Sequence, residues 1–307
     1  MSPRDIRTAI KDRFQAGPVD LSVIIACYNA RASVEACLES LRAQRTAHRF
    51  EVLLVDSSQD GTAELVGRRF PEVQLLHRPE RLYCGSARNR ALPLAVAPVV
   101  AFLDADCLVS PPWVEAVLAA HRSGHLIAGG IIDNGTGGNL AAWAYYFCEF
   151  SHWLPSRRPR EVREMAGCCL SFKKDLYQRY GPFLEGSYCS DTVFLRSLRQ
   201  SGHRIMFIPA IRVWHTFSDS ASSFLKHQFE HRRWYGRVCF PRRNRRDWRH
   251  WLYILSLPLH PALLLGTVAW RLRRHPAYAG YFLLSLPLVA AGFVARILGE
   301  ACAFLES

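Results

Sequence analysis

The chain has 307 residues, which exceeds one average domain, so we expect one catalytic domain with an appended segment. Its ten cysteines are scattered, which excludes a disulfide framework and a Cys-x-x-Cys zinc site and favours reduced thiols in the cytosol. The net charge of +13 at pH 7 indicates an acidic partner, either a nucleic acid or a membrane surface.

The main domain is predicted to begin with a strand followed by a helix. Residues 1–19 form an N-terminal extension in which charged residues precede any apolar run, so no signal peptide is expected. Residues 21–29 are an apolar run of strand length that ends in polar side chains. Residues 34–41 then repeat apolar side chains at helical spacing.

The same alternation continues along the chain. Residues 51–56 form a second strand-length run, and residues 57–62 have the composition of a loop and a helix N-cap. A helix led by residues 84–90 precedes a third apolar run at residues 99–103. Strands that alternate with helices at this pitch predict a parallel sheet and therefore an α/β fold.

Acidic residues follow two of these runs, at Asp56 and at Asp104-Ala105-Asp106. In an open α/β sheet, ligands bind just outside the carboxyl ends of the strands. Because Asp104 and Asp106 flank one small residue, both carboxylates can face a single divalent cation. Hard carboxylate oxygens suit Mg²⁺ or Mn²⁺ partnered by substrate phosphates. A solvated acidic turn is the alternative interpretation of such a pair.

Four segments in this order resemble the family-2 glycosyltransferases, which have the GT-A fold. They are Ser22-Val-Ile-Ile-Ala-Cys-Tyr-Asn29, Val55-Asp-Ser-Ser-Gln-Asp-Gly-Thr62, Gly85-Ser-Ala-Arg-Asn89 and Leu103-Asp-Ala-Asp106. The resemblance covers residues 20–110 and continues more loosely to residue 240. It implies a Rossmann-like, mostly parallel sheet and an inverting, membrane-associated enzyme with a nucleotide-sugar donor.

The resemblance also implies which residues bind the donor. Seven would contact the nucleotide: Ala26, Tyr28, Asn29, Asp56, Arg88, Asn89 and Asp104. Asp56 could accept a hydrogen bond from a base N–H, or could be only a loop cap. Arg88 and Asn89 lie in the first turns of a helix, where backbone N–H groups and a cation favour phosphate. An exposed helical arginine is the alternative for Arg88.

The same resemblance assigns the metal to Asp106 and Asp104. His215 stands where some relatives supply a further metal ligand, and its imidazole suits Mn²⁺ better than Mg²⁺. A structural histidine is the alternative.

The catalytic base is expected at the start of a later amphipathic helix, residues 191–199. Family-2 enzymes commonly carry a Glu-Asp pair here, whose Asp is the base. In this chain Ser190 replaces the first acid and Asp191 remains. Asp191 is therefore the implied base, and a first-turn acid that interacts only with the helix dipole is the alternative.

Positive charge gathers before two long apolar runs. Residues 221–250 carry nine Lys or Arg against two acidic residues, and residues 251–270 and 277–295 contain no Asp, Glu, Lys or Arg. Each run has the length of a membrane span, and a membrane interface attracts basic residues and tryptophans. We therefore expect a basic amphipathic linker helix, a membrane-associated apolar helical hairpin, and no nucleic acid partner.

Several topologies of the hairpin stay open. Pro258 and Pro261 interrupt the first apolar run, so it could lie in the interface or re-enter the membrane. Two full spans would place one basic cluster on the wrong side, and a buried hairpin in a soluble protein is a third possibility. With membrane attachment, we expect the catalytic domain on the cytoplasmic side.

The sequence thus predicts a GT-A catalytic domain at residues 20–220, a basic linker at 221–250 and membrane-associated helices at 251–307. The enzyme would transfer a sugar from a nucleotide-sugar to an acceptor hydroxyl, in cell-envelope glycan, glycolipid or small-molecule glycoside synthesis, with Mn²⁺ or Mg²⁺ as cofactor. One alternative is a polyprenyl-phosphate glycosyltransferase, whose anionic acceptor needs no base. The other is a non-catalytic nucleotide-binding membrane adaptor.

Overall fold

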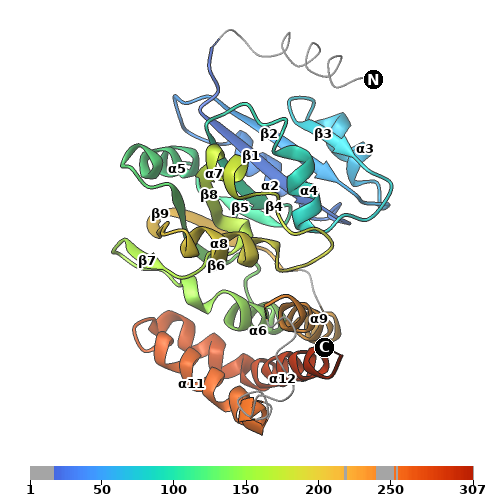
Figure 1. The fold of residues 1–307 in the computed structure, drawn as a ribbon, viewed down its shortest axis with the longest axis vertical. Helices are drawn as coiled ribbons and strands as arrows, with labels where there is room; N and C mark the ends of the chain where they lie inside the picture. Colours follow the sequence, from blue (N-terminus) through green and yellow to red (C-terminus); the bar gives the residue numbers. More distant parts are fainter. Residues whose placement is uncertain (1–16, 218–219, 240–251, 254, 307) are drawn as a thin grey trace.

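A computed structural model describes residues 17–217, 220–239, 252–253 and 255–306 (Figure 1). The remaining residues include residues 1–16 of the N-terminal extension and residues 240–250 of the predicted basic linker, so the predictions for these stretches lie outside the described residues.

Nine strands form one mixed sheet in the order β3-β2-β1-β4-β8-β6-β9-β5, with β7 paired to β9. The strands are β1 (Leu21–Cys27), β2 (Phe50–Asp56), β3 (Gln74–His77), β4 (Val99–Asp104), β5 (Cys107–Val109), β6 (Ile127–Asn134), β7 (Arg160–Val162), β8 (Leu170–Lys173) and β9 (Ile205–His215). The pairs β3-β2, β2-β1, β1-β4 and β6-β9 are parallel, whereas β8, β5 and β7 run against their neighbours. Most strands therefore share one direction, which confirms the predicted mostly parallel α/β sheet.

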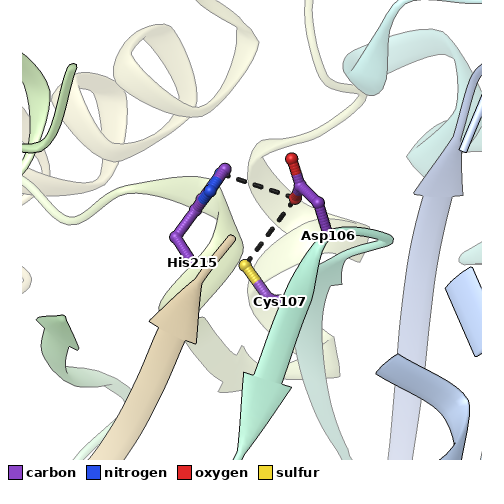
Figure 2. Close-up of side chains that lie close together, drawn as sticks. All are labelled: Asp106, Cys107 and His215. Carbon is purple, nitrogen blue, oxygen red and sulfur yellow. Dashed lines mark hydrogen bonds and ion pairs between the residues drawn. The ribbon is translucent and has the colours of Figure 1, made fainter. Parts of the chain in front are cut away.

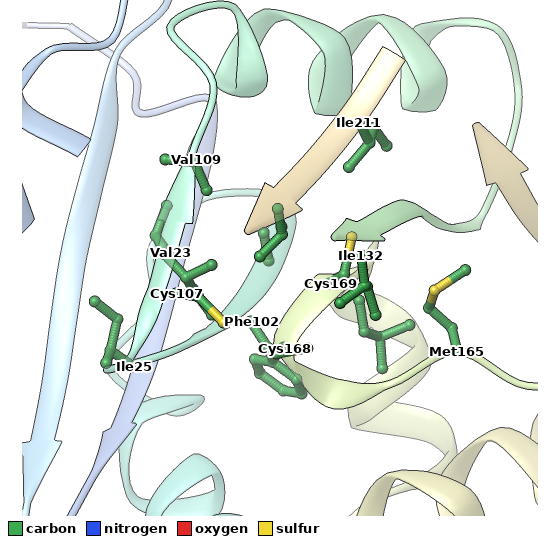
Figure 3. Close-up of a cluster of buried hydrophobic side chains, with 14 of the residues drawn as sticks. Val23, Ile25, Phe102, Cys107, Val109, Ile132, Met165, Cys168, Cys169 and Ile211 are labelled. Atoms are coloured by element: carbon green, nitrogen blue, oxygen red, sulfur yellow. The ribbon is translucent and has the colours of Figure 1, made fainter. Parts of the chain in front are cut away.

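Helices connect these strands and pack around the sheet. They are α2 (Val34–Arg42), α3 (Thr62–Arg69), α4 (Cys84–Ala91), α5 (Trp113–Arg122), α7 (Lys174–Tyr180) and α8 (Ser190–Gln200), with short 3₁₀ turns η1 (Ser151–Trp153) and η2 (Gly167–Cys169). Because β1 and β4 are buried on both faces, their sequences are nearly continuous apolar runs. Figure 3 shows part of the resulting core, to which β1 contributes Val23 and Ile25, β4 Phe102 and β5 Cys107.

A second group of helices lies beside the sheet, on the side where the chain ends (Figure 1). It contains α6 (Leu140–Glu149), α9 (Ala221–Cys239), α11 (His260–Leu272) and α12 (Pro276–Glu306), and a 3₁₀ turn, η3 (Leu257–Leu259), leads into α11. Helix α12 packs most extensively on α9 and α6. A Cβ atom at Gly299 of α12 would lie 2.1 Å from the carbonyl oxygen of Phe229 in α9, so only glycine allows this approach of the two backbones.

The two predicted apolar runs differ in the structure. Among the described residues, α12 is the helix long and apolar enough to cross a membrane by length and composition. Helix α11 has 13 residues, too few for a span of about 20. Exposed large apolar side chains occur on both helices: Leu259 just before α11, Leu263 and Trp270 on α11, and Leu283, Leu284, Val294, Leu298 and Leu305 on α12. The hairpin therefore consists of one span-length helix and one shorter helix.

Strand β9 carries an irregularity that positions the site. Its register with β6 shifts between Gly129 and Ile131, and a Cβ atom at Gly130 would lie 2.0 Å from the carbonyl oxygen of Ile211. Beyond this shift, β9 pairs antiparallel with β5, so that His215 lies opposite Cys107. The end of β9 is thereby brought to the acidic loop that follows β4.

Candidate active site

A cavity of about 710 Å³ opens at the carboxyl ends of β1 and β4 and extends to the C-terminal helices. Eight of the ten predicted site residues line it: Ala26, Tyr28, Asn29, Arg88, Asp104, Asp106, Asp191 and His215. Asp56 and Asn89 are not among its lining residues. We call the part lined by α6, η1, α9, α11 and α12 the far half, and the part lined by β1, α4 and the loop after β4 the donor half.

Asp56 lies fully buried beneath the donor half. One carboxylate oxygen accepts the Ser58 hydroxyl at 2.5 Å, and the other lies 2.9 Å from Nδ1 of His77. The Ser58 hydroxyl oxygen in turn accepts the backbone N–H of Asn29 at 2.7 Å. Asn29 has a φ of 49°, a left-handed conformation that asparagine tolerates better than most residues. Asp56 therefore fixes the two loops that border the donor half, and its contact with a base stays a prediction.

Arg88 is buried, so the exposed-arginine alternative is wrong. Its Nη2 lies 3.5 Å from the Asp104 carboxylate, and its guanidinium stacks 4.6 Å above the Phe102 ring. A Cβ atom at Gly167 would lie 2.4 Å from Nη2, so a glycine there leaves room for the guanidinium. Burial alone would lower the pKa of Arg88, but nearby Cys84 and Asp104 outweigh it and raise the pKa. Arg88 is thus a fixed cation in the donor half.

Asn89 uses its side-chain amide to hold another loop. Its Nδ2 donates to the Phe183 carbonyl and to Glu185, each at 2.9 Å, and its Oδ1 accepts the Phe183 N–H at 2.9 Å. This loop leads toward Asp191. The geometry therefore indicates a positioning role for Asn89, which its position in the sequence did not reveal.

The two predicted metal-binding aspartates lie on either side of Ala105. Burial, reinforced by the charge of Asp106, raises the pKa of Asp104, while Arg88 opposes the shift. The backbone carbonyl of Asp106 accepts the N–H and hydroxyl of Thr216 at 2.8 and 2.7 Å, which joins the loop to the end of β9. The pairing of β5 with β9 then carries His215 to this loop.

Figure 2 shows one carboxylate oxygen of Asp106 facing both His215 and Cys107. The Asp106 carboxylate lies 3.4 Å from Nε2 of His215 and accepts the Cys107 thiol at 3.9 Å. Two atoms that each bind one ion at about 2.1 Å are about 3 Å apart at the right angle of an octahedral site. The carboxylate and the imidazole therefore fit a divalent cation with little adjustment, and this donor pair suits Mn²⁺.

Asp191 lies in the first turn of α8 and lines the cavity. Its Oδ2 accepts the Gly167 N–H at 2.8 Å and its Oδ1 accepts the Thr192 N–H at 2.8 Å. A carboxylate has about four acceptor positions, so two remain for another donor. Ser190, which stands where the family commonly has Glu, is fully buried and does not line the cavity.

The far half contains residues that sequence reasoning did not find. The Tyr145 hydroxyl lies 2.7 Å from Nε2 of His227, and Glu149 lies 3.6 Å from Arg296 and 3.8 Å from His231. Burial opposes ionisation of Glu149, but Arg296 and His231 outweigh it and lower its pKa to about 2. Tyr145 and Glu149 belong to α6, which is mostly buried in the core and lines the cavity with one side.

The chain is similar in sequence to known glycosyltransferases. The family model described as glycosyl transferase family 2 matches residues 22–181. Glycosyltransferase AglE of Haloferax volcanii is 29% identical over 170 residues, which are 53% of this chain and 55% of that protein. Validoxylamine A glucosyltransferase of Streptomyces hygroscopicus subsp. jinggangensis is 38% identical over 106 residues, 33% of this chain and 25% of that protein. The chain thus spans about half, or less, of the length of these curated relatives.

Solved structures share the fold. The mannosyltransferase PcManGT from Pyrobaculum calidifontis, in complex with GDP-Man and Mn²⁺, has a TM-score of 0.60 at 18% identity and covers 97% of this chain and 92% of its own. Residues 1–349 of S. aureus TarS, in complex with UDP-GlcNAc, have a TM-score of 0.53 at 16% identity and cover 92% of this chain and 90% of their own. These similarities confirm the predicted GT-A fold.

Proposed function

The chain belongs to glycosyl transferase family 2, whose model matches more than half of its residues, and we propose that it is a metal-dependent, inverting glycosyltransferase. It would transfer a sugar from a nucleotide-sugar donor to an acceptor hydroxyl. The observation that carries this proposal is one cavity that gathers a buried cation, two carboxylates of which one lies beside an imidazole, and a further carboxylate. These are Arg88, the pair Asp104 and Asp106 with His215, and Asp191.

The donor half has the charges that a nucleoside diphosphate requires. Arg88 offers a desolvated positive charge, which attracts phosphate more strongly than an exposed one does. Asp106, His215 and Asp104 would hold Mn²⁺ or Mg²⁺, the ion present with GDP-Man in PcManGT being Mn²⁺. When bound, such an ion neutralises the charge that develops on a departing diphosphate. Asn29 and Tyr28 border the same space and would contact the nucleoside.

Asp191 is proposed as the general base. Its free acceptor positions would take the proton of the acceptor hydroxyl while that oxygen attacks the anomeric carbon. The bond from this carbon to the diphosphate oxygen breaks, and its electron pair leaves with the nucleoside diphosphate. Attack from the face opposite the leaving group inverts the anomeric configuration. The Gly167 N–H, which binds one carboxylate oxygen, keeps the side chain aimed into the cavity.

We further propose that the GT-A domain spans residues 20–220 and that α9 links it to a membrane-associated part. The exposed apolar side chains of α12 support membrane attachment. The arginines of α9 instead pair with Glu300 and Glu306 of α12, so within the described residues they join α9 to α12. This arrangement would keep the catalytic domain on the cytoplasmic side. Cell-envelope glycans, glycolipids and small-molecule glycosides stay the predicted acceptor classes.

A screen of nucleotide-sugars against the detergent-extracted full chain tests the proposal. We expect release of nucleoside diphosphate from at least one donor, dependent on Mn²⁺ or Mg²⁺ and abolished by Asp106→Asn. Binding of nucleotide without turnover of any donor, with every acceptor class supplied, would instead favour the non-catalytic adaptor. Turnover that persists in Asp191→Asn with a polyprenyl phosphate acceptor would favour the polyprenyl-phosphate enzyme, because that acceptor is already anionic.

A further inference from the structure

We infer that the far half of the cavity binds the anionic group of an amphiphilic, lipid-linked acceptor, and that Arg271 is the cation that recognises this group. The inference rests on the proposed function, because the anion would belong to the lipid carrier of an acceptor whose hydroxyl Asp191 activates in the same cavity. The bound group would be a phosphate-like anion, which either a lipid-linked phosphate or free inorganic phosphate could supply. Binding of probes with and without an apolar chain distinguishes the two.

Arg271 stands near the end of α11 and lines the cavity. Its Nη1 donates to the Ser151 hydroxyl at 3.0 Å, and its Nη2 lies 3.2 Å from Nδ1 of His152. Both partners belong to η1. Within the described part of the chain, no carboxylate lies within ion-pair distance of this guanidinium. Its positive charge is therefore held in place without being neutralised.

His152 does not add a competing charge. Burial, together with the nearby Arg271 and Arg296, lowers its pKa to about 4. At neutral pH the imidazole is uncharged, so its Nδ1 can accept an N–H of Arg271. The neighbours of Arg271 thus orient the guanidinium and leave its charge for a ligand.

The other arginines of the far half are already paired. Arg296 lies 3.6 Å from Glu149, and Arg232 lies 3.0 Å from Glu300. A half-buried charge is costly unless an opposite charge or hydrogen bonds compensate it. Arg271 has the hydrogen bonds but lacks the opposite charge, which an anionic ligand would supply.

An apolar surface adjoins this cation. Leu264, Thr267 and Val268 line the cavity one to two turns before Arg271 on the same helix. The adjoining side of the helix carries Leu263 and Trp270, each more than 60% exposed. A free phosphate gains nothing by contacting an apolar surface, whereas the apolar chain of a lipid-linked phosphate could lie along α11 from the cavity to the membrane. Charge and apolar surface together therefore fit an amphiphile.

Binding of three probes to the full chain in detergent tests this subsite. The probes are farnesyl phosphate, farnesol, which lacks the anion, and inorganic phosphate, which lacks the apolar chain. Each titration contains saturating Mn²⁺ and GDP or UDP, so that the donor half is occupied. We expect farnesyl phosphate to bind at least ten times more tightly than either other probe.

Two variants assign the binding to α11. Arg271→Gln should weaken farnesyl phosphate binding about tenfold, the lower end for a charge-assisted hydrogen bond, and leave farnesol unchanged. Thr267→Phe, which narrows the apolar side, should weaken farnesyl phosphate but not inorganic phosphate. The matched control is Arg273→Gln, because the Arg273 guanidinium stacks 4.1 Å from the exposed Trp270 ring and does not line the cavity.

Three results would overturn the inference: equal affinity for farnesol and farnesyl phosphate, equal affinity for inorganic phosphate, or an Arg271→Gln variant that binds like wild type. The second result would indicate a free-phosphate site. Failure of the proposed function gives a different result: a chain that binds no nucleoside diphosphate, whatever the base, would contradict the donor site, while the three titrations would still report on Arg271.

Discussion

Replacing Asp191 by asparagine should remove catalysis and leave donor binding intact. General-base assistance is worth about 10²–10⁴-fold, so kcat for sugar transfer should fall by this factor, equivalent to about 3–5 kcal/mol of transition-state stabilisation. The structural cost is smaller. The carboxylate accepts two backbone N–H groups, from Gly167 and Thr192, whereas an asparagine side chain has one accepting oxygen.

One charge-assisted hydrogen bond and part of the helix-dipole interaction are therefore lost, on the order of 2 kcal/mol of unfolding free energy. A domain with a typical stability of about 5–15 kcal/mol stays folded after such a loss. The assay compares kcat for transfer, nucleotide-sugar affinity by titration calorimetry and the denaturation midpoint.

Asp175→Asn is the matched control. Asp175 is also a first-turn acid, in α7, and its carboxylate accepts the Leu176 N–H at 3.0 Å, but it does not line the cavity. It should show a similar or smaller loss of stability and normal kcat. A folded Asp191→Asn protein that transfers sugar to a hydroxyl at nearly the wild-type rate would refute the assignment of the base.

Further perturbations test the metal site, the helix packing, the pH response and the C-terminal helix. Asp106→Asn should abolish turnover and make nucleoside diphosphate affinity independent of Mn²⁺, which calorimetry with and without the ion measures. Gly299→Val should push α12 away from the Phe229 carbonyl and lower the free energy of unfolding by about 1–3 kcal/mol, measured by thermal denaturation. Gly280→Val should leave the free energy of unfolding nearly unchanged, because the space around Gly280 in the same helix is open. Burial lowers the pKa of His121 to about 4, so the unfolded state binds its proton first, and urea unfolding should show stability falling as the pH drops from 6.5 toward 4. Deleting residues 276–306 should expose the apolar faces of α6 and α9, so light scattering should detect aggregation even after membranes are removed.

The sequence predicted those parts of the fold that depend on local pattern. The strands that end at Asp56 and Asp104 are continuous apolar runs, and the helix that begins at Ser190 has an apolar face at helical spacing. Such periodicity is set by which faces are buried, so it can be read without knowledge of distant partners. The acidic residues at the strand ends followed from the same reasoning, because parallel strands bring their carboxyl ends to one edge.

The rest of the site depends on contacts between distant segments. His215 reaches Asp106 because β9 shifts its register against β6 at Gly130 and then pairs with β5. No local pattern near His215 records this shift, and only the family resemblance suggested its role. Asn89 likewise looked like a phosphate ligand from its place in a helix, but its amide holds the loop at Phe183. Spacing along the chain therefore predicts which residues lie near a site, but it does not predict which side chains or backbone groups they contact there.

The packing of α12 has a consequence for how an acceptor would arrive. Only one third of the most apolar stretch of α12 is buried inside the protein, so most of this stretch is available to contact lipid. Phe293, Arg296 and Ile297 on this helix line the cavity, whereas Leu298 beside them is exposed. If α12 lies in a bilayer, the far half of the cavity must lie next to that bilayer, because the same turn of helix borders both. A lipid-linked acceptor could then pass from the bilayer along α11 into the far half of the cavity that Asp191 also lines.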